Sequence, residues 1–141
     1  MGFSVVAAAA MLGVAIFICI EVITGSVFPT VEDVDLSYAT LADRKIDIYQ
    51  TNVNITSVTT TAYGLNYNHS INITNDGSTT LDTSKCMILI NGTNYQFNCT
   101  VDYLYPAKYA LFNVTNLPGA GDKTAKIVTQ NGIEDYYTYT I

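Results

Sequence analysis

The chain has 141 residues and a formal net charge of −6, with six Lys and Arg against twelve Asp and Glu. An acidic chain is a poor ligand for nucleic acid and for anionic lipid headgroups, so we expect neither as a partner. One His and three Cys, without a Cys–His cluster, argue against a zinc site.

Residues 1–28 predict a membrane anchor. No residue from Gly2 through Ile20 is charged, and a helix rising about 1.5 Å per residue crosses the roughly 30 Å hydrocarbon core over that length. The run is longer than a signal-peptide core and lacks a basic segment before it, which favours an uncleaved single span. Ala9 and Gly13 form a small-xxx-small pair that would let another helix pack closely, and the alternative is that small residues are simply tolerated in a membrane helix. Glu21 is either hydrated at the interface or paired with a neighbouring subunit.

Residues 29–50 predict an amphipathic helix, here called the stalk. Gly25 and Pro29 indicate a bend or break before it, and Thr30 with Asp33 has the spacing of a capping box. Whether anchor and stalk form one bent rod or two pieces stays open. Apolar residues recur at steps of three, four or seven, as on one helix face: Val31, Val34, Tyr38, Leu41 and Ile48.

Residues 51–141, here called the head domain, change to an apolar period of two, which predicts strands. Asn75-Asp76-Gly77 and Asn131-Gly132 are turn signals. No helical crossover separates the strands, so the expected fold is mainly β, with an antiparallel immunoglobulin-like β-sandwich of about seven strands after the helices. The expected strands are Val53–Ile55, Tyr67–Asn75, Lys85–Ile90, Tyr95–Val101, Tyr109–Thr115, Lys123–Gln130 and Ile133–Ile141.

The N-glycosylation pattern Asn-x-Ser/Thr occurs six times, where roughly two matches are expected by chance. Nearly all of these asparagines fall on the polar face of an expected strand or in a turn, as glycan attachment requires. The sequence therefore predicts glycans on some of them, and the alternative is a bare Asn- and Thr-rich surface. The acceptors are Asn54, Asn68, Asn72, Asn91, Asn98 and Asn113.

Cys86 and Cys99 are predicted to form a disulfide. If Ile90 pairs with Tyr95 across a four-residue loop, Cys86 falls opposite Cys99 on one apolar face, at a separation that a disulfide can span. Two buried thiols are the alternative. A disulfide and glycans would each place the head domain outside the cytoplasm, with the amino terminus inside.

No residue constellation predicts catalysis, a cofactor or a metal site. His69 stands alone on an apolar strand face, which is typical of a packed core histidine. The eleven Tyr either supply contact area or fill the core. Tyr136, Tyr137 and Tyr139 are the predicted contact surface, because a last strand is often an edge strand open to pairing.

The whole chain resembles the archaellum (archaeal flagellum) accessory proteins of the FlaF family. The likeness is carried by Met1-Gly2-Phe3-Ser4 before the apolar run, by Glu21 at its end and by Phe28-Pro29-Thr30-Val31 before the acidic stalk. It implies a single-pass protein of the cell membrane that acts as a stator, whose extracytoplasmic head grips the surface-layer protein. It also implies a FlaG-type partner and a homodimer. No family motif singles out lattice-contacting residues here.

The alternative is an archaellin or type IV pilin-like filament subunit packed through its N-terminal helix. Phe17 and Glu21 have the spacing of a pilin's mature start. However, Ala15-Ile16 before Phe17 does not provide the basic and small residues that pilin processing needs. Cleavage there would also leave too little apolar helix for a filament core. A tethered enzyme has no residue set behind it.

Overall fold

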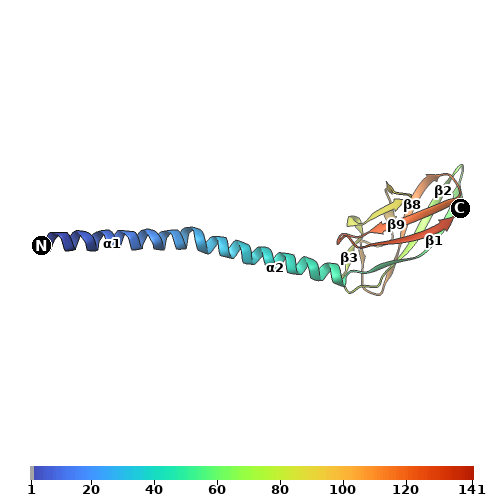
Figure 1. Ribbon diagram of the computed structural model, residues 1–141. Coiled ribbons are helices and arrows are strands. Elements are labelled where there is room, and N and C mark those ends of the chain that lie inside the picture. The colour runs from blue at the N-terminus through green and yellow to red at the C-terminus, as the bar shows by residue number, and fades with distance from the viewer. Residues whose placement is uncertain (1) are drawn as a thin grey trace. The chain divides into compact units, whose positions relative to one another are not determined.

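The computed structural model describes residues 2–141, so Met1, where the predicted anchor begins, lies outside the described residues. The chain divides into a unit that ends at Asp43 and a unit Arg44–Ile141. Residues 2–50 are helical: α1 (Gly2–Val22), a π turn (Ile23–Val27) and α2 (Phe28–Gln50) (Figure 1). This helix is long and apolar enough to cross a membrane.

At the predicted bend or break between anchor and stalk, the helix continues through the π turn at Ile23–Val27. Pro29 lacks the N–H that would bond the Gly25 carbonyl in an α-helix, and the π turn already shifts the bonding pattern around that carbonyl. The predicted capping box is wrong, because the Thr30 hydroxyl donates to the Ser26 carbonyl over 2.7 Å. A continuing helix supplies carbonyl partners for the N–H groups that a cap would satisfy.

The head domain is an antiparallel β-sandwich, which confirms the predicted fold class. Within the described residues it has ten strands instead of about seven, three of which are two residues long. The sheets have the orders β1-β2-β8-β6 and β10-β9-β4-β5, and β3 pairs with β7 (Figure 1). The strands are β1 (Val53–Tyr63), β2 (Asn66–Asn75), β3 (Leu81–Asp82), β4 (Met87–Ile90), β5 (Thr93–Tyr95), β6 (Asn98–Cys99), β7 (Tyr103–Leu104), β8 (Tyr109–Pro118), β9 (Asp122–Val128) and β10 (Glu134–Thr140).

Alternate side chains on the strands of both sheets form one core. On β2, Ile71 and Ile73 are fully buried between half-buried polar neighbours, as the alternation predicted. Burying side chains of this size contributes about 1.5–3 kcal/mol each. His69 is only 1% exposed, which confirms the predicted core histidine. The second sheet supplies Ile88, Ile90, Ala125 and Ile127.

The register of β4 with β5 differs from the predicted one. Ile90 pairs with Thr93, and Ile88 pairs with Tyr95. The connection is a two-residue turn, in which Asn91 and Gly92 take φ angles of 49° and 81°. Asn-Gly is the pair that such a hairpin turn favours, so the shorter loop forms in place of the four-residue one.

The cross-strand pairing of Cys86 and Cys99 is therefore wrong. Beyond β5 the chain crosses to the other sheet, where Cys99 pairs with Phe112 of β8. Cys86 lies just before β4, in the facing sheet. Both cysteines are free in the structure.

Candidate functional site

The end of α2 is held by the head domain through backbone hydrogen bonds. The N–H groups of residues 76–79, in the turn after β2, donate to the carbonyls of Gln50 and Asn52 over 2.8–3.3 Å. The last carbonyls of a helix have no partner within the helix. Here the head domain supplies those partners, and the helix end becomes part of the sandwich. We call this contact the joint.

The turn in the joint is built by Asn75 and Gly77. The amide of Asn75 is fully buried, donates to the Thr79 and Leu104 carbonyls over 2.8 and 2.9 Å, and accepts from the Gly77 N–H over 3.1 Å. A Cβ on Gly77 would lie 2.3 Å from the Gln50 oxygen. The predicted Asn-Asp-Gly turn is confirmed, but its hydrogen bonding to the end of α2 was not predicted.

A second turn fixes the short link between α2 and β1. The Asn131 amide donates to the Thr51 hydroxyl over 2.7 Å, and that hydroxyl donates to the Asp47 carbonyl over 2.7 Å. Thr51 is buried. Only Thr51 and Asn52 separate the helix from β1, so the joint contains no flexible linker.

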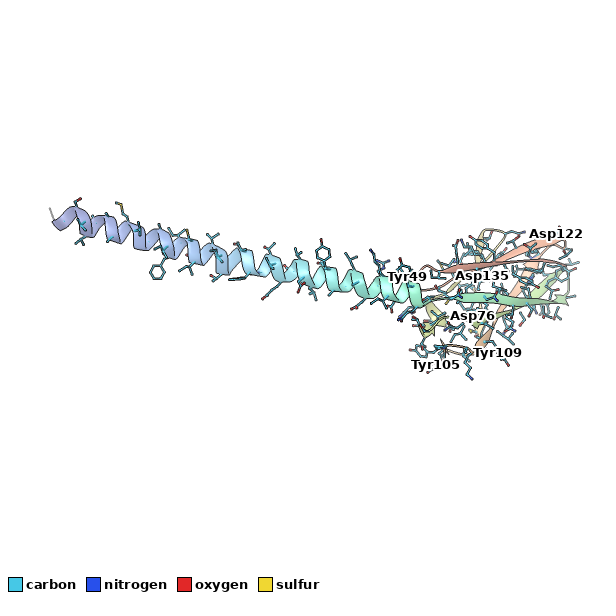
Figure 2. The ribbon with its side chains drawn as sticks, turned by 60° about the horizontal axis from the view of Figure 1, so that its bottom comes forward. Tyr49, Asp76, Tyr105, Tyr109, Asp122 and Asp135 are labelled. Atoms are coloured by element: carbon cyan, nitrogen blue, oxygen red, sulfur yellow. The ribbon has the colours of Figure 1, made fainter. Side chains whose placement is uncertain are left out.

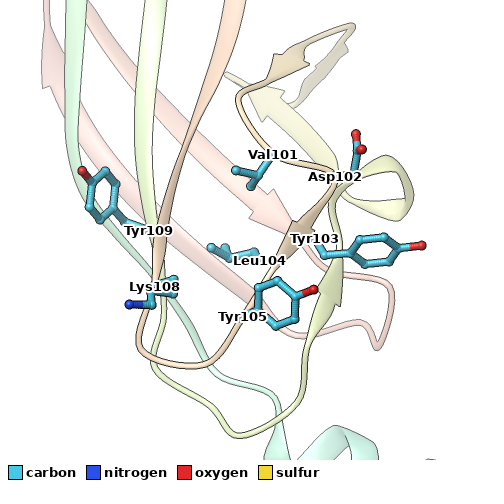
Figure 3. Close-up of a pocket in the computed structure, with 7 residues that line it drawn as sticks. All are labelled: Val101, Asp102, Tyr103, Leu104, Tyr105, Lys108 and Tyr109. Atoms are coloured by element: carbon cyan, nitrogen blue, oxygen red, sulfur yellow. The ribbon is translucent and has the colours of Figure 1, made fainter.

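An aromatic cavity of about 480 Å³ opens beside β7 and the loop that leads to β8. Tyr103, Tyr105 and Tyr109 are 54%, 58% and 67% exposed, and Leu104 below them is buried. Figure 3 shows Tyr103 and Tyr109 pointing to opposite sides, with Tyr105 between them. Figure 2 shows Tyr105 and Tyr109 projecting from the same part of the head domain. The cavity is lined by Val101, Asp102, Tyr103, Leu104, Tyr105, Lys108 and Tyr109.

Of the three tyrosines predicted as a contact surface, only Tyr136 is exposed. Tyr137 and Tyr139 pack against the core, because β10 alternates and these side chains point inward with Asp135. Tyr136 donates to Glu134 over 2.6 Å and lies beneath the Lys126 ammonium, 4.8 Å from the ring centre. Lys126 also forms an ion pair with Glu134. Exposed ion pairs contribute little to stability.

Strand β10 is an edge strand, as predicted, but its edge is partly occupied. It pairs with β9 only. Its Asp135 carboxylate accepts a 2.7 Å hydrogen bond from the Ile55 N–H of β1. An inward-pointing charge on an edge strand discourages pairing with another chain. The aromatic cavity is therefore a stronger candidate contact surface than β10.

His69 joins the two sheets inside the core. Its Nδ1 lies 2.6 Å from the Tyr139 hydroxyl, and the two rings meet edge to face. Burial, and then the charge of Lys123, lowers the pKa of His69. Burial raises the pKa of Tyr139 to about 12. The pair is a neutral structural contact between β2 and β10.

The remaining predicted sites are dispersed. Burial, and then the neighbouring Cys99 charge, raises the pKa of Cys86 to about 11.

Ala9, Gly13 and Glu21 lie along α1, and their role in helix packing stays a prediction. Among the six glycan acceptors, three are exposed (Asn54, Asn91, Asn98) and three are half-buried (Asn68, Asn72, Asn113).

No family model matches the chain, and no curated protein matches it. Among solved structures, the archaellum periplasmic stator protein FlaG from Sulfolobus acidocaldarius is similar. It is 22% identical with a TM-score of 0.54, and the match covers 63% of this chain and 99% of that chain. This likeness shows that the chain shares the fold of that stator protein.

Proposed function

We infer that the protein is a non-enzymatic, membrane-anchored structural component of the archaellum machinery and acts as a stator. One observation carries this inference. A sandwich with the fold of an archaellum stator protein is attached, without a linker, to a helix apolar enough to span a membrane. A stator resists torque, and a head bonded directly to its helix suits a part under load.

The proposed topology places α1 in the cell membrane and the head domain on the extracytoplasmic side. The head binds the surface-layer protein there, and a FlaG-type protein and a second copy of the chain are further proposed partners. Whether the chain is a FlaF protein in particular belongs to this proposal. Its support is the sequence resemblance.

The aromatic cavity is the proposed contact with the surface-layer protein. Exposed Tyr side chains over a buried Leu104 offer apolar area with polar tips, the combination that dominates protein interfaces. The energy of the contact then comes from burying the tyrosines rather than from net charge.

The test is co-purification of the full chain with the surface-layer protein from its own cells. A Tyr105→Ala, Tyr109→Ala double variant should capture at least tenfold less surface-layer protein. The control is Tyr136→Ala, which removes a tyrosine that is 53% exposed on the other sheet and should change nothing. Equal capture by all three proteins would contradict the contact. Normal swimming of cells that lack the chain would contradict the stator role.

A filament subunit is the second candidate, because residues 2–50 are helical from α1 through the π turn to α2, and a filament subunit would pack through this N-terminal helix. The mass of the mature chain separates the two functions. A chain shortened to begin at Phe17 favours the filament subunit, and a chain that keeps the whole apolar run favours the stator.

A further inference from the structure

The sheet β1-β2-β8-β6 carries no Asp, Glu, Lys or Arg on any of its strands. Its outward rows consist largely of hydroxyl and amide side chains, such as Thr59–Ser70–Asn113–Asn98 across the four strands. Soluble protein surfaces ordinarily mix charges of both signs over such a face. An uncharged sheet with open edges invites pairing with other chains.

The exposed glycan acceptors lie at the uncharged edges of the sandwich. The two edge strands of this sheet are β1 and β6, and they carry Asn54 and Asn98, both exposed. The edge strand of the other sheet that lacks charges is β5, and Asn91 lies in the turn immediately before it. The acceptors on the central strands β2 and β8 are half-buried.

The fourth edge, β10, provides the contrast. It carries Glu134 and the inward-pointing Asp135, whose carboxylate accepts a hydrogen bond from the Ile55 N–H. It has no Asn-x-Ser/Thr pattern. Among the four edge strands of the two four-stranded sheets, the one with charges thus has no acceptor, whereas each one without charges has an exposed acceptor on it or beside it.

The amide nitrogens of the exposed acceptors are available. Asn91 uses its Oδ1 to accept the Thr124 N–H over 2.8 Å, which leaves its Nδ2 without a bond. Asn54 and Asn98 make no side-chain hydrogen bond to any residue from 2 to 141. Asn113 on the central strand also accepts through its Oδ1, from the Ser70 hydroxyl over 2.8 Å, but it is half-buried and pairs directly with Asn98.

We propose that Asn54, Asn98 and Asn91 carry N-linked glycans that cover the uncharged edges of the sandwich. In the transfer, Nδ2 forms a bond to the anomeric carbon of a sugar carried by a lipid-phosphate donor. The bond between that carbon and the phosphate oxygen breaks, and the lipid phosphate leaves with the electron pair. Nδ2 gives one proton to a base of the transferase. Bulky hydrated sugar then hinders pairing with other chains at three edges, as charge does at β10.

The test is the intact mass and glycopeptide map of the full chain purified from its own cells. The mass should exceed the sequence mass. Asn54→Gln, Asn91→Gln and Asn98→Gln should each remove one sugar increment. The matched control is Thr115→Ala, which destroys the pattern at Asn113 without touching its bond to Ser70 and should remove none. A bare mass, or sugar confined to Asn68, Asn72 and Asn113, would overturn the proposal.

A second readout tests the covering of the edges. The Asn54→Gln, Asn98→Gln double variant should form more high-molecular-mass aggregate in sedimentation than the glycosylated chain, and no increase would overturn that role. The proposal requires an extracytoplasmic head but not a stator. Protease accessibility of the head in whole cells separates the glycan proposal from the stator proposal. A head that is accessible but carries no sugar would contradict only the glycan proposal, and an inaccessible head would contradict both proposals.

Discussion

The environment of a single thiol sets its reactivity at Cys86. Its pKa is raised to about 11, mainly by burial, so at pH 8 about one molecule in a thousand carries the thiolate that reacts. We expect maleimide to label Cys86 far more slowly than Cys99 in the folded protein, and at a similar rate after denaturation. Peptide mapping by mass spectrometry measures both rates. Labelling of neither cysteine until a reductant is added would instead reveal a disulfide.

His69 makes the stability of the head domain dependent on pH. Its pKa in the folded state is lowered from 6.5, because an imidazolium would be charged in the core and its Nε2 already lacks a partner among the described residues. The unfolded chain therefore binds a proton that the folded chain does not. The free energy of unfolding falls as the pH drops below about 6.5, by at most about 1.4 kcal/mol per unit.

The matched variant is His69→Gln, which removes the titrating group and keeps hydrogen-bonding capacity toward Tyr139. Thermal unfolding between about pH 7 and pH 5 should show a smaller loss of stability in the variant than in the original chain. The same pH dependence in both proteins would assign the effect to other groups.

The joint between α2 and the turn at residues 76–79 depends on a missing side chain. Gly77→Ala would place a Cβ 2.5 Å from the Asn52 nitrogen as well as against the Gln50 oxygen. We expect it to lower stability by about 1–3 kcal/mol, as overpacking does, and to expose the helix end to protease. Chemical denaturation measures the loss. Asp76→Ala in the same turn is the control, since its side chain is exposed and its backbone bonds remain.

The contact between β10 and β1 depends on one carboxylate. Asp135→Ala removes the acceptor of the Ile55 N–H, and an unsatisfied N–H costs about 1–3 kcal/mol. The edge of β10 also loses its inward charge. We expect lower stability together with concentration-dependent association in sedimentation. Glu134→Ala, at the exposed neighbouring position, should lose less than half as much, and equal losses would contradict the specific bond.

The registers of these strands differ in how far sequence could determine them. The alternation of Ile71 and Ile73 fixed the faces of β2, because a shift by one residue would bury the neighbouring Asn72. A shift by two residues leaves every side chain on its own face. The apolar pattern of Ile88 and Ile90 therefore could not choose between pairing with Thr93 and pairing with Tyr95. The turn chemistry of Asn91-Gly92 selected the pairing of Ile90 with Thr93. The predicted cross-strand pairing of Cys86 with Cys99 depended on the other register and was therefore wrong.

The candidate contact sites were harder to predict for a different reason. The joint consists of backbone bonds from residues 76–79 to the carbonyls of Gln50 and Asn52. Every residue carries the same backbone groups, so the sequence does not reveal such bonds. Tyr103 lies in a strand of two residues, Tyr105 in the loop after it and Tyr109 at the start of β8, so no single periodic segment contains all three. The position of β10 as the last strand drew attention instead to Tyr136, Tyr137 and Tyr139. Of these, Tyr137 and Tyr139 follow the inward phase of their strand.

At the scale of the molecule, the unit Arg44–Ile141 includes the last turns of α2. A fragment 44–141 should be more stable to urea than a fragment 53–141, because only the first retains the Gln50 and Asn52 carbonyls that accept from the turn after β2. Comparison of the two urea midpoints checks this. A fragment 53–141 of equal stability would show that the head domain does not need the helix end.

The uncharged sheet has a consequence for the conditions under which the protein works. Dissolved ions screen only interactions between charges, and the outward face of β1, β2, β8 and β6 has no carboxylate, amine or imidazole to be screened or titrated. No charge on this face is therefore screened in brine or neutralised in acid. This side of the molecule presents one constant surface to a changing medium.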